Sequence, residues 1–187
     1  LPGETSGRLK PLSKWSNFTL TSVPMGHEIC VTPINMACAY LVLANDGIYL
    51  PPTIIDTIID KDGTIFKRYL PSQLKRIYPQ NVAKTMQDML RSVVERGTAK
   101  KANVSNLHIA GKTGTAQKIE KTGGYSQTDY IAVFAGFANL DSENLCAIMM
   151  VDTPQNVHTG GAVAAPAISN IFKNSLFNRK FVVKTRE

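Results

Sequence analysis

The sequence predicts an α+β fold in which an antiparallel sheet is flanked by helices. Two helical patterns come first, three strand patterns joined by short turns follow, and one helical pattern closes the chain. That order differs from the alternation of strands and helices that gives a parallel sheet. With 187 residues, 43% of them hydrophobic and 19% charged, the chain suits one domain or a large piece of one.

The first helix is predicted to begin at Thr32-Pro33, because threonine can cap a helix and proline suits the first helical position. Apolar residues then recur at three- and four-residue steps as far as Ala44. Asn45-Asp46-Gly47 ends the pattern with a glycine suited to a left-handed cap. Residues 1–32 are rich in Pro, Gly, Ser and Thr, and we expect loop with short ordered pieces there.

A β-hairpin and a second helix follow. Residues 53–59 and 64–66 are rich in β-forming side chains, and Asp60-Lys61-Asp62-Gly63 between them is a turn signal. The helix is predicted over residues 81–96, where apolar side chains form one face, and Gly97 ends it.

Three strands and a closing helix are predicted after residue 107. The strands are predicted over residues 108–116, 130–139 and 145–151, with a polar turn at 140–144. A glycine-rich segment at 159–161 leads into a helix predicted over 163–176. We expect one domain portion over 1–177 and a mobile, basic tail over 178–187.

The composition disfavours several classes of function. The net charge of +7 could serve nucleic acid or an anionic partner, but it also suits a solvated surface. Basic residues are scattered and no aromatic-basic motif is present, so we expect no nucleic-acid binding. The cysteines and histidines lack metal-ligand spacing, and we expect no metal and no cofactor. Cys38 and Cys146 lie in apolar runs and are expected to act as small core residues.

The most informative stretch is Ala110-Gly111-Lys112-Thr113-Gly114-Thr115-Ala116. In a strand, Lys112 and Gly114 would share one face, and Thr113 and Thr115 would share the other. An ammonium suits a carboxylate or shapes the proton affinity of a nearby hydroxyl, and glycine lets another backbone approach closely. Threonine hydroxyls and strand N–H groups can bind a carboxylate or a developing oxyanion. On an edge strand, the segment could receive an extended peptide.

Two other interpretations of this string are open. Taken alone, Lys112 to Thr115 could form an ordinary turn. Gly111-Lys112-Thr113 also resembles the end of a phosphate-binding loop. That loop requires a glycine five residues earlier, where the sequence has Asn106, and a helix afterwards, where it reads as strand. The phosphate-binding interpretation is therefore disfavoured.

Other short strings accompany this stretch in a fixed order. They are Leu1-Pro2-Gly3-Glu4, the run from Gly26 to Met36, Arg96-Gly97-Thr98-Ala99, and the run from Gly160 to Pro166. The ordered set resembles the C-terminal half of the transpeptidase domain of class B penicillin-binding proteins. The resemblance extends from Leu1 to about Phe177. It implies a partial domain of the fold shared by penicillin-binding proteins and serine β-lactamases.

Members of that family cross-link the stem peptides of peptidoglycan. A serine in a Ser-x-x-Lys motif attacks the penultimate D-alanine, an acceptor amine resolves the acyl-enzyme, and β-lactams acylate the same serine. The resemblance implies that Lys112, Thr113, Gly114 and Thr115 bind the substrate or the β-lactam. Lys112 would support the proton network around the serines, and Thr113 and Thr115 would bind the carboxylate. The backbone N–H of Thr115 would be one oxyanion-hole donor.

The serine motifs of the family do not occur at the expected places. Ser72-Gln73-Leu74-Lys75 matches Ser-x-x-Lys but lies where the family has no nucleophile. Ser142-Glu143-Asn144 matches Ser-x-Asn but follows Lys112 instead of preceding it. We interpret both as chance matches. The sequence therefore predicts that this chain has no nucleophile, is inactive alone, and takes its serine from a preceding segment or a second polypeptide.

The leading prediction is the substrate- and β-lactam-binding half of a cell-wall D,D-transpeptidase. The alternative is a non-catalytic module that binds peptides or partners. The strings around Gly26–Met36 and Gly160–Pro166 disfavour a β-lactam sensor or a serine β-lactamase. Expected partners are the missing half of the domain and proteins of cell division or elongation, with the division type favoured. A membrane anchor outside the fragment would hold the domain on the extracytoplasmic, periplasmic side of the cytoplasmic membrane.

Overall fold

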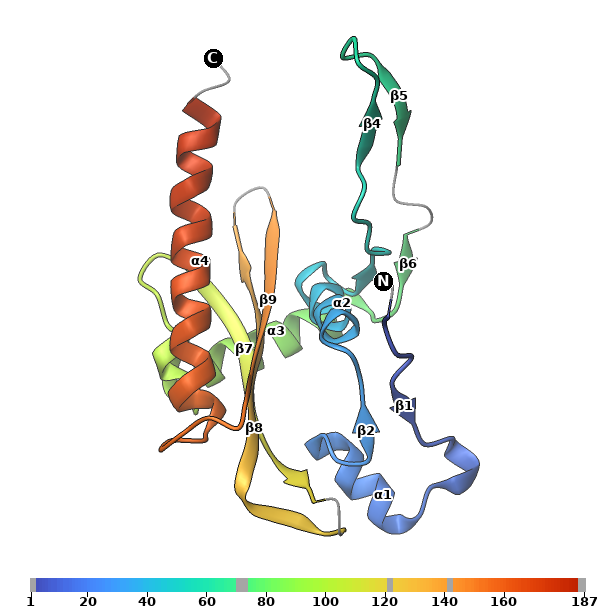
Figure 1. Cartoon of the computed structure of the whole chain (residues 1–187), viewed down its shortest axis with the longest axis vertical. Helices are drawn as coiled ribbons and strands as arrows, with labels where there is room; N and C mark the ends of the chain where they lie inside the picture. Colours follow the sequence, from blue (N-terminus) through green and yellow to red (C-terminus); the bar gives the residue numbers. More distant parts are fainter. Residues whose placement is uncertain (1–2, 70–73, 121–122, 141–142, 185–187) are drawn as a thin grey trace. The chain divides into compact units, whose positions relative to one another are not determined.

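The computed structural model describes residues 3–69, 74–120, 123–140 and 143–184, with side chains as far as residue 175 (Figure 1). The chain divides into two compact units, Leu1–Met36 and Ala37–Glu187. Every residue of the predicted binding stretch belongs to the second unit.

The first unit consists of short ordered pieces joined by loops, as the sequence predicts. The pieces are β1 (Arg8–Leu9), α1 (Asn17–Ser22), β2 (Ile29–Cys30) and two 3-10 turns at Leu12–Lys14 and Val23–Met25. β1 and β2 pair in antiparallel fashion. The carboxylate of Glu28 ties the unit together, since it accepts hydrogen bonds from Ser22 Oγ at 2.6 Å and Lys10 Nζ at 2.9 Å.

Two helices occur where the sequence predicts them. α2 (Pro33–Ala44) begins directly after Thr32, whose Oγ1 accepts the N–H of Asn35 at 3.3 Å. α3 (Gln80–Arg96) ends at Gly97, whose N–H donates to the carbonyl of Val93 at 3.0 Å. A Cβ on Gly97 would lie 2.8 Å from the Cα and the carbonyl oxygen of Val93, so a larger residue would displace this helix end.

The predicted hairpin is also present. β4 (Thr57–Ile59) and β5 (Ile65–Arg68) pair in antiparallel fashion, and Asp60 Oδ1 closes the turn by accepting the N–H groups of Asp62 and Thr64. A further pair, β3 (Ile48–Tyr49) with β6 (Lys75–Arg76), was not predicted. Strands of two residues are too short to show a period in the sequence.

The central sheet has the order β7-β8-β9 and is antiparallel throughout. Its strands are β7 (His108–Ile119), β8 (Tyr125–Asn139) and β9 (Asn144–Asp152). The sequence predicts all three strands, but it ends β7 at 116 instead of Ile119 and begins β8 at 130 instead of Tyr125. The extra residues are mostly polar, and one pair, Ile119 with Tyr125, lies beyond a register irregularity between Gln117 and Ile119. β7 is an edge strand among the described strands.

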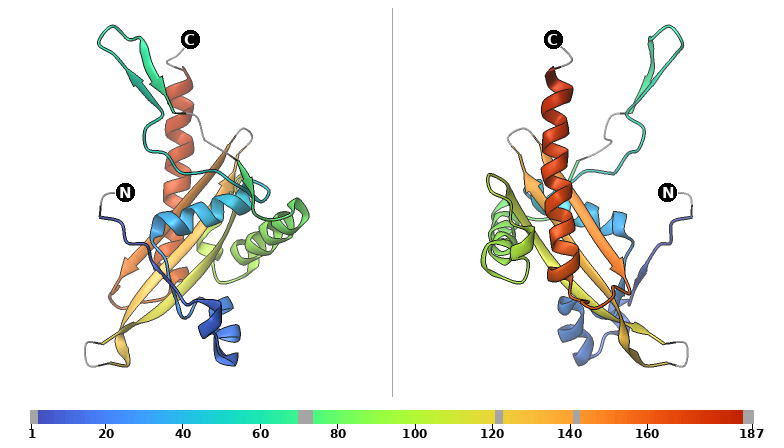
Figure 2. Two further views of the ribbon diagram at one scale, coloured as in Figure 1. Left: turned by 90° about the vertical axis from the view of Figure 1, so that its right-hand side faces the viewer. Right: turned by 60° about the vertical axis from the view of Figure 1, so that its left-hand side comes forward.

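Each face of the sheet packs against a different helix (Figure 2). On one face, α4 (Gly160–Lys184) buries Ile168 and Phe172 against Ile109 and Phe134. On the other face, Ala44 of α2 packs with Leu90, Ala110 and Phe137. Since side chains alternate along a strand, Thr113 and Thr115 share the α4 face with Ile109, and Lys112 and Gly114 share the opposite face with Ala110.

A pair of glycines fixes the register of the first two strands. Gly111 lies opposite Gly136 in the ladder. A Cβ on Gly111 would lie 2.5 Å from the ring of Phe134, and a Cβ on Gly136 would lie 2.6 Å from the carbonyl oxygen of Ala110. Both positions therefore exclude side chains, and the Phe134 ring fills the space they leave.

The closing helix is longer than predicted. α4 extends from Gly160 to Lys184 instead of 163–176, because no glycine or proline follows Pro166 to end it. The backbone of the expected tail over 178–187 is thus helical as far as Lys184, and its mobility stays an expectation. No helix among the described residues is long and apolar enough to cross a membrane.

Candidate substrate-binding site

Lys112 lies on the edge strand with its side chain exposed. Its ammonium donates to the carbonyl oxygen of Thr113 at 2.8 Å, and no carboxylate of the described residues pairs with it. The charge is therefore available to a ligand or to a group contributed by another segment.

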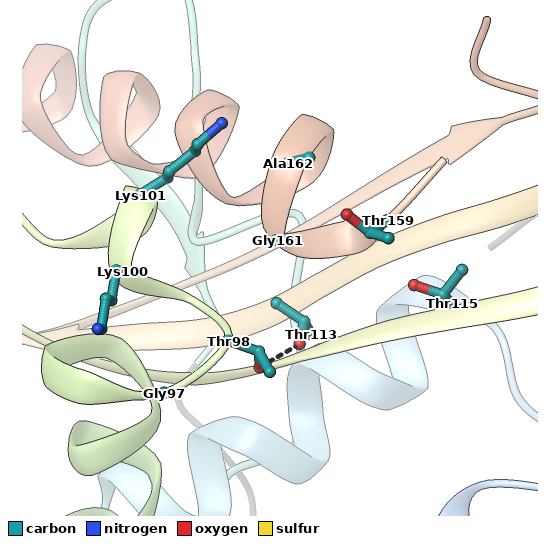
Figure 3. Close-up of a pocket in the computed structure, with 9 residues that line it drawn as sticks. All are labelled: Gly97, Thr98, Lys100, Lys101, Thr113, Thr115, Thr159, Gly161 and Ala162. Atoms are coloured by element: carbon teal, nitrogen blue, oxygen red, sulfur yellow. Dashed lines mark hydrogen bonds between the residues drawn. The ribbon is translucent and has the colours of Figure 1, made fainter. Parts of the chain in front are cut away.

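The two threonine hydroxyls point to the opposite face and contact the elements packed there (Figure 3). Thr113 Oγ1 lies 2.7 Å from Thr98 Oγ1, in the loop that follows α3. Thr115 Oγ1 accepts the N–H of Gly160, the first residue of α4, at 3.2 Å. The strand, the loop and the start of α4 thus meet around these two residues.

A hollow of about 540 Å³ lies at this meeting point. It is lined by Gly97, Thr98, Lys100, Lys101, Thr113, Thr115, Thr159, Gly161 and Ala162. Four of these nine residues carry hydroxyls, two carry ammonium groups, and none of the nine is acidic (Figure 3). Hydroxyl donors and cations without a competing carboxylate suit an anionic ligand group.

The backbone of β7 has free edge positions at alternate residues. In an antiparallel ladder, every second residue directs its N–H and C=O away from the neighbouring strand. The carbonyl oxygens of Gly114 and Val133, which are paired in register, lie together under Gly160, as expected of a hydrogen-bonded pair. The N–H and C=O groups of Thr113 and Thr115 then face outward, in agreement with the bond from Lys112 to the Thr113 carbonyl.

Gly114 is a position of the stretch at which the packing would leave room for a side chain. A Cβ placed there would meet only the Cβ of Val133, at 3.8 Å, which is ordinary contact. The glycine is therefore not required by the packing of the described residues. It leaves the strand accessible to close approach from the face that Lys112 shares.

The protein-family model of the penicillin binding protein transpeptidase domain matches residues 1–173 of this chain. The chain belongs to this family. Among curated relatives, it is 39% identical over 181 residues to penicillin-binding protein PbpB of Mycolicibacterium smegmatis. It is 32% identical over 173 residues to peptidoglycan D,D-transpeptidase FtsI of Escherichia coli K12. These similarities place it among the class B penicillin-binding proteins, as the sequence predicts.

The chain corresponds to only part of its relatives. It aligns over 91% of its own length with both proteins, but over 28% of PbpB and 27% of FtsI. Penicillin binding protein 3 of Mycobacterium tuberculosis, 33% identical, has a TM-score of 0.83 in its apo form over 97% of this chain and 42% of that chain. The same protein complexed with ampicillin has a TM-score of 0.84. The predicted α+β transpeptidase-like fold is thereby confirmed.

The two serine matches of this chain can be placed only in part. Ser72 and Ser142 both lie outside the described residues. Lys75, the last residue of the first match, lies in the exposed strand β6. Asn144, the last residue of the second, donates to the carbonyl of Ala44 at 2.9 Å and to Asn45 Oδ1 at 2.8 Å. Asn144 thus connects β9 to the end of α2, away from the Lys112 stretch.

Two hydroxyl-bearing residues of the hollow, Thr98 and Thr159, received no role from the sequence. Thr98 belongs to the string Arg96-Gly97-Thr98-Ala99, and Thr159 precedes α4. Both come from segments that tertiary packing brings to β7, so strand alternation could not reveal them. The sequence signal that could have found Thr98 is its position directly after the glycine that ends α3.

Among the described residues, no group of three or more metal-ligating side chains could hold a metal ion.

Proposed function

We propose that this chain provides the substrate-binding strand of a peptidoglycan D,D-transpeptidase whose serine nucleophile lies outside these 187 residues. The observation that carries the proposal is the edge of β7, where the Lys112 ammonium has no carboxylate partner among the described residues. The hollow beside it contains hydroxyls and ammonium groups and is lined by no acidic residue. The family and the solved relatives support it.

The carboxylate of a D-alanyl-D-alanine end, or of a β-lactam, would bind between the hydroxyls of Thr113 and Thr115. Each hydroxyl can donate one proton, and the nearby lysines stabilise the negative charge. The hydroxyls already have protein partners, but a hydroxyl that accepts one bond still has its own proton to donate.

Two groups would act on the reaction itself. The outward N–H of Thr115 would donate to the carbonyl oxygen as it becomes an oxyanion, a contribution typically worth about 3 to 4 kcal/mol per donor. The Lys112 ammonium, on the opposite face, would hold the proton network of the serines in its reactive state. A stem peptide would extend along the outer edge of β7 by strand addition.

The rest of the proposal concerns the parent protein. The catalytic serine would come from a preceding segment or from a second polypeptide, since the serine matches in this chain lie in other parts of the sequence. A membrane anchor outside this chain would hold the domain on the extracytoplasmic side of the membrane. Similarity to a relative named FtsI favours a role in cell division, with division proteins as partners.

Labelled penicillin tests the proposal directly. The 187-residue chain alone should form no covalent adduct, whereas the intact protein that contains it should be labelled on a serine elsewhere, as read by mass spectrometry. In the intact protein, Lys112→Ala should slow acylation by about two orders of magnitude, a typical loss for a group that assists proton transfer. An adduct on Ser72 of the isolated chain would show that our interpretation of that serine is wrong.

A further inference from the structure

We propose that Thr98 is a positioning residue that directs the hydroxyl proton of Thr113 toward the carboxylate of the ligand. The inference rests on the function proposed above and adds a residue to which that function gives no role. It follows from the contact between the two hydroxyls, from the rigidity of the loop that carries Thr98, and from the number of protons available.

The contact is short and joins two separate elements. Thr98 Oγ1 and Thr113 Oγ1 lie 2.7 Å apart, at the usual distance for a good hydrogen bond between hydroxyls. Thr98 belongs to the loop between α3 and a 3-10 turn at Lys100–Ala102, and Thr113 belongs to β7 (Figure 3). Both residues line the hollow.

The loop that carries Thr98 cannot shift easily. Ala99 and Ala102 are fully buried in the core under α4. The N–H of Ala99 donates to the carbonyl of Val93 at 3.1 Å, and the N–H of Gly97 donates to the same oxygen. The carbonyl oxygen of Thr98 lies against Gly161, where a Cβ would not fit. The Thr98 hydroxyl is therefore presented to Thr113 from a fixed backbone.

Proton counting then sets the direction of the contact. Each hydroxyl has one proton, and the pair shares one of them between the two oxygens. When a carboxylate accepts the proton of Thr113, the Thr113 oxygen can only accept from Thr98. The result is a chain of donors from Thr98 to Thr113 to the anion, in which each bond polarises the next. Without the Thr98 hydroxyl, the Thr113 hydroxyl loses the partner that orients it.

Acylation kinetics of the intact transpeptidase with labelled penicillin test this role. Thr98→Val keeps the branched shape and removes the hydroxyl, so the second-order acylation rate should fall about tenfold, as for one lost hydrogen bond. The loss should appear in the penicillin concentration for half-maximal rate more than in the maximal rate. Thr98→Ser should restore the wild-type value, and Thr85→Val, the same change on exposed α3, should have no effect.

Two comparisons separate positioning from a merely structural role. In a Thr113→Val background, Thr98→Val should slow acylation no further, because the oriented hydroxyl is already absent. With the methyl ester of the same penicillin, Thr98→Val should have little effect, since no carboxylate is present to accept the proton.

The possible outcomes distinguish this inference from the proposed function. Wild-type kinetics in Thr98→Val, additive losses with Thr113→Val, or equal slowing of acid and ester would each overturn the role of Thr98 alone. If penicillin does not acylate the wild-type intact protein, the proposed function is wrong and the role of Thr98 fails with it.

Discussion

Gly114 is a glycine of β7 that the packing of the described residues does not require. The described packing leaves room for a Cβ there, and the residue shares its exposed face with Lys112. At the neighbouring positions the reverse holds, because Gly111 is excluded from bearing a side chain by Phe134 and by the carbonyl of Ala135. Packing therefore requires the glycine at 111, whereas at 114 we propose that the glycine serves the approach of a ligand.

Gly114→Ala should leave stability almost unchanged and impair binding. The added methyl group meets only Val133, so the free energy of unfolding should shift by no more than about 0.5 kcal/mol. Acylation of the intact protein by labelled penicillin should fall at least about tenfold, because the methyl group occupies the space for close approach. Urea unfolding and acylation rates measure the two effects, and undiminished acylation would show that the open face is not used.

For individual residues, the sequence predicts well the part of the candidate site that lies on β7. The alternation of a strand is enough to separate Lys112 and Gly114 from Thr113 and Thr115. It gives no information on Thr98 and Thr159, because their position depends on how a loop and a helix start pack on β7.

Among the elements, the contact of α4 with β7 determines the shape of the hollow. Gly160 begins α4 and lies directly over the carbonyl oxygens of Gly114 and Val133, and its N–H donates to Thr115. The sequence predicts that a helix follows the glycine-rich segment, but the extent of α4 and the target of its first turn depend on long-range packing. The period of hydrophobic residues identifies a helix or strand. Where that helix or strand ends depends on its contacts with residues distant in the chain.

Gly160→Ala should therefore damage both the fold and the site. Its Cβ would overlap backbone oxygens of two strands, which cannot rotate away as a side chain could. We expect a loss of about 1 to 3 kcal/mol in the free energy of unfolding, together with slower acylation of the intact protein. Gly114→Ala is the matched control for the stability effect, since it makes the same chemical change in open space. Equal stability of the two variants would contradict the described position of α4.

Across the second unit as a whole, two ionisable groups with raised pKa values lie on the α2 face of the sheet. Under α2, Tyr40 and Cys146 pack beside the core cluster that contains Phe137. Burial raises the pKa of Tyr40 to about 12, with a smaller contribution from the charge of Cys146. Burial likewise raises the pKa of Cys146 to about 12, with a smaller contribution from Cys38.

These raised pKa values predict a loss of stability at alkaline pH. The folded chain keeps both protons up to about pH 12, whereas the unfolded chain releases them near pH 9 for the thiol and pH 10 for the phenol. The folded state thus binds more protons in this window, and the free energy of unfolding falls as pH rises through it. Each group contributes at most about 1.4 kcal/mol per pH unit.

Urea unfolding of this chain between pH 8 and pH 10.5 measures the effect. Tyr40→Phe and Cys146→Ala should each flatten the decline, because each removes one proton that the folded state retains. A decline of the same slope in both variants would assign it to other groups.

The facing glycines Gly111 and Gly136 have a consequence for how the chain tolerates change. A shift of β7 by one residue would exchange the two faces and turn the ammonium of Lys112 toward α4. The face on which each residue of the candidate site lies thus depends on the register of β7. The glycine pair, whose Gly111 directly precedes Lys112 in the strand, maintains that register. The register irregularity between Gln117 and Ile119 lies on the far side of Thr115. We therefore expect insertions near the tip of the β7–β8 hairpin to be absorbed there without inverting residues 112–115.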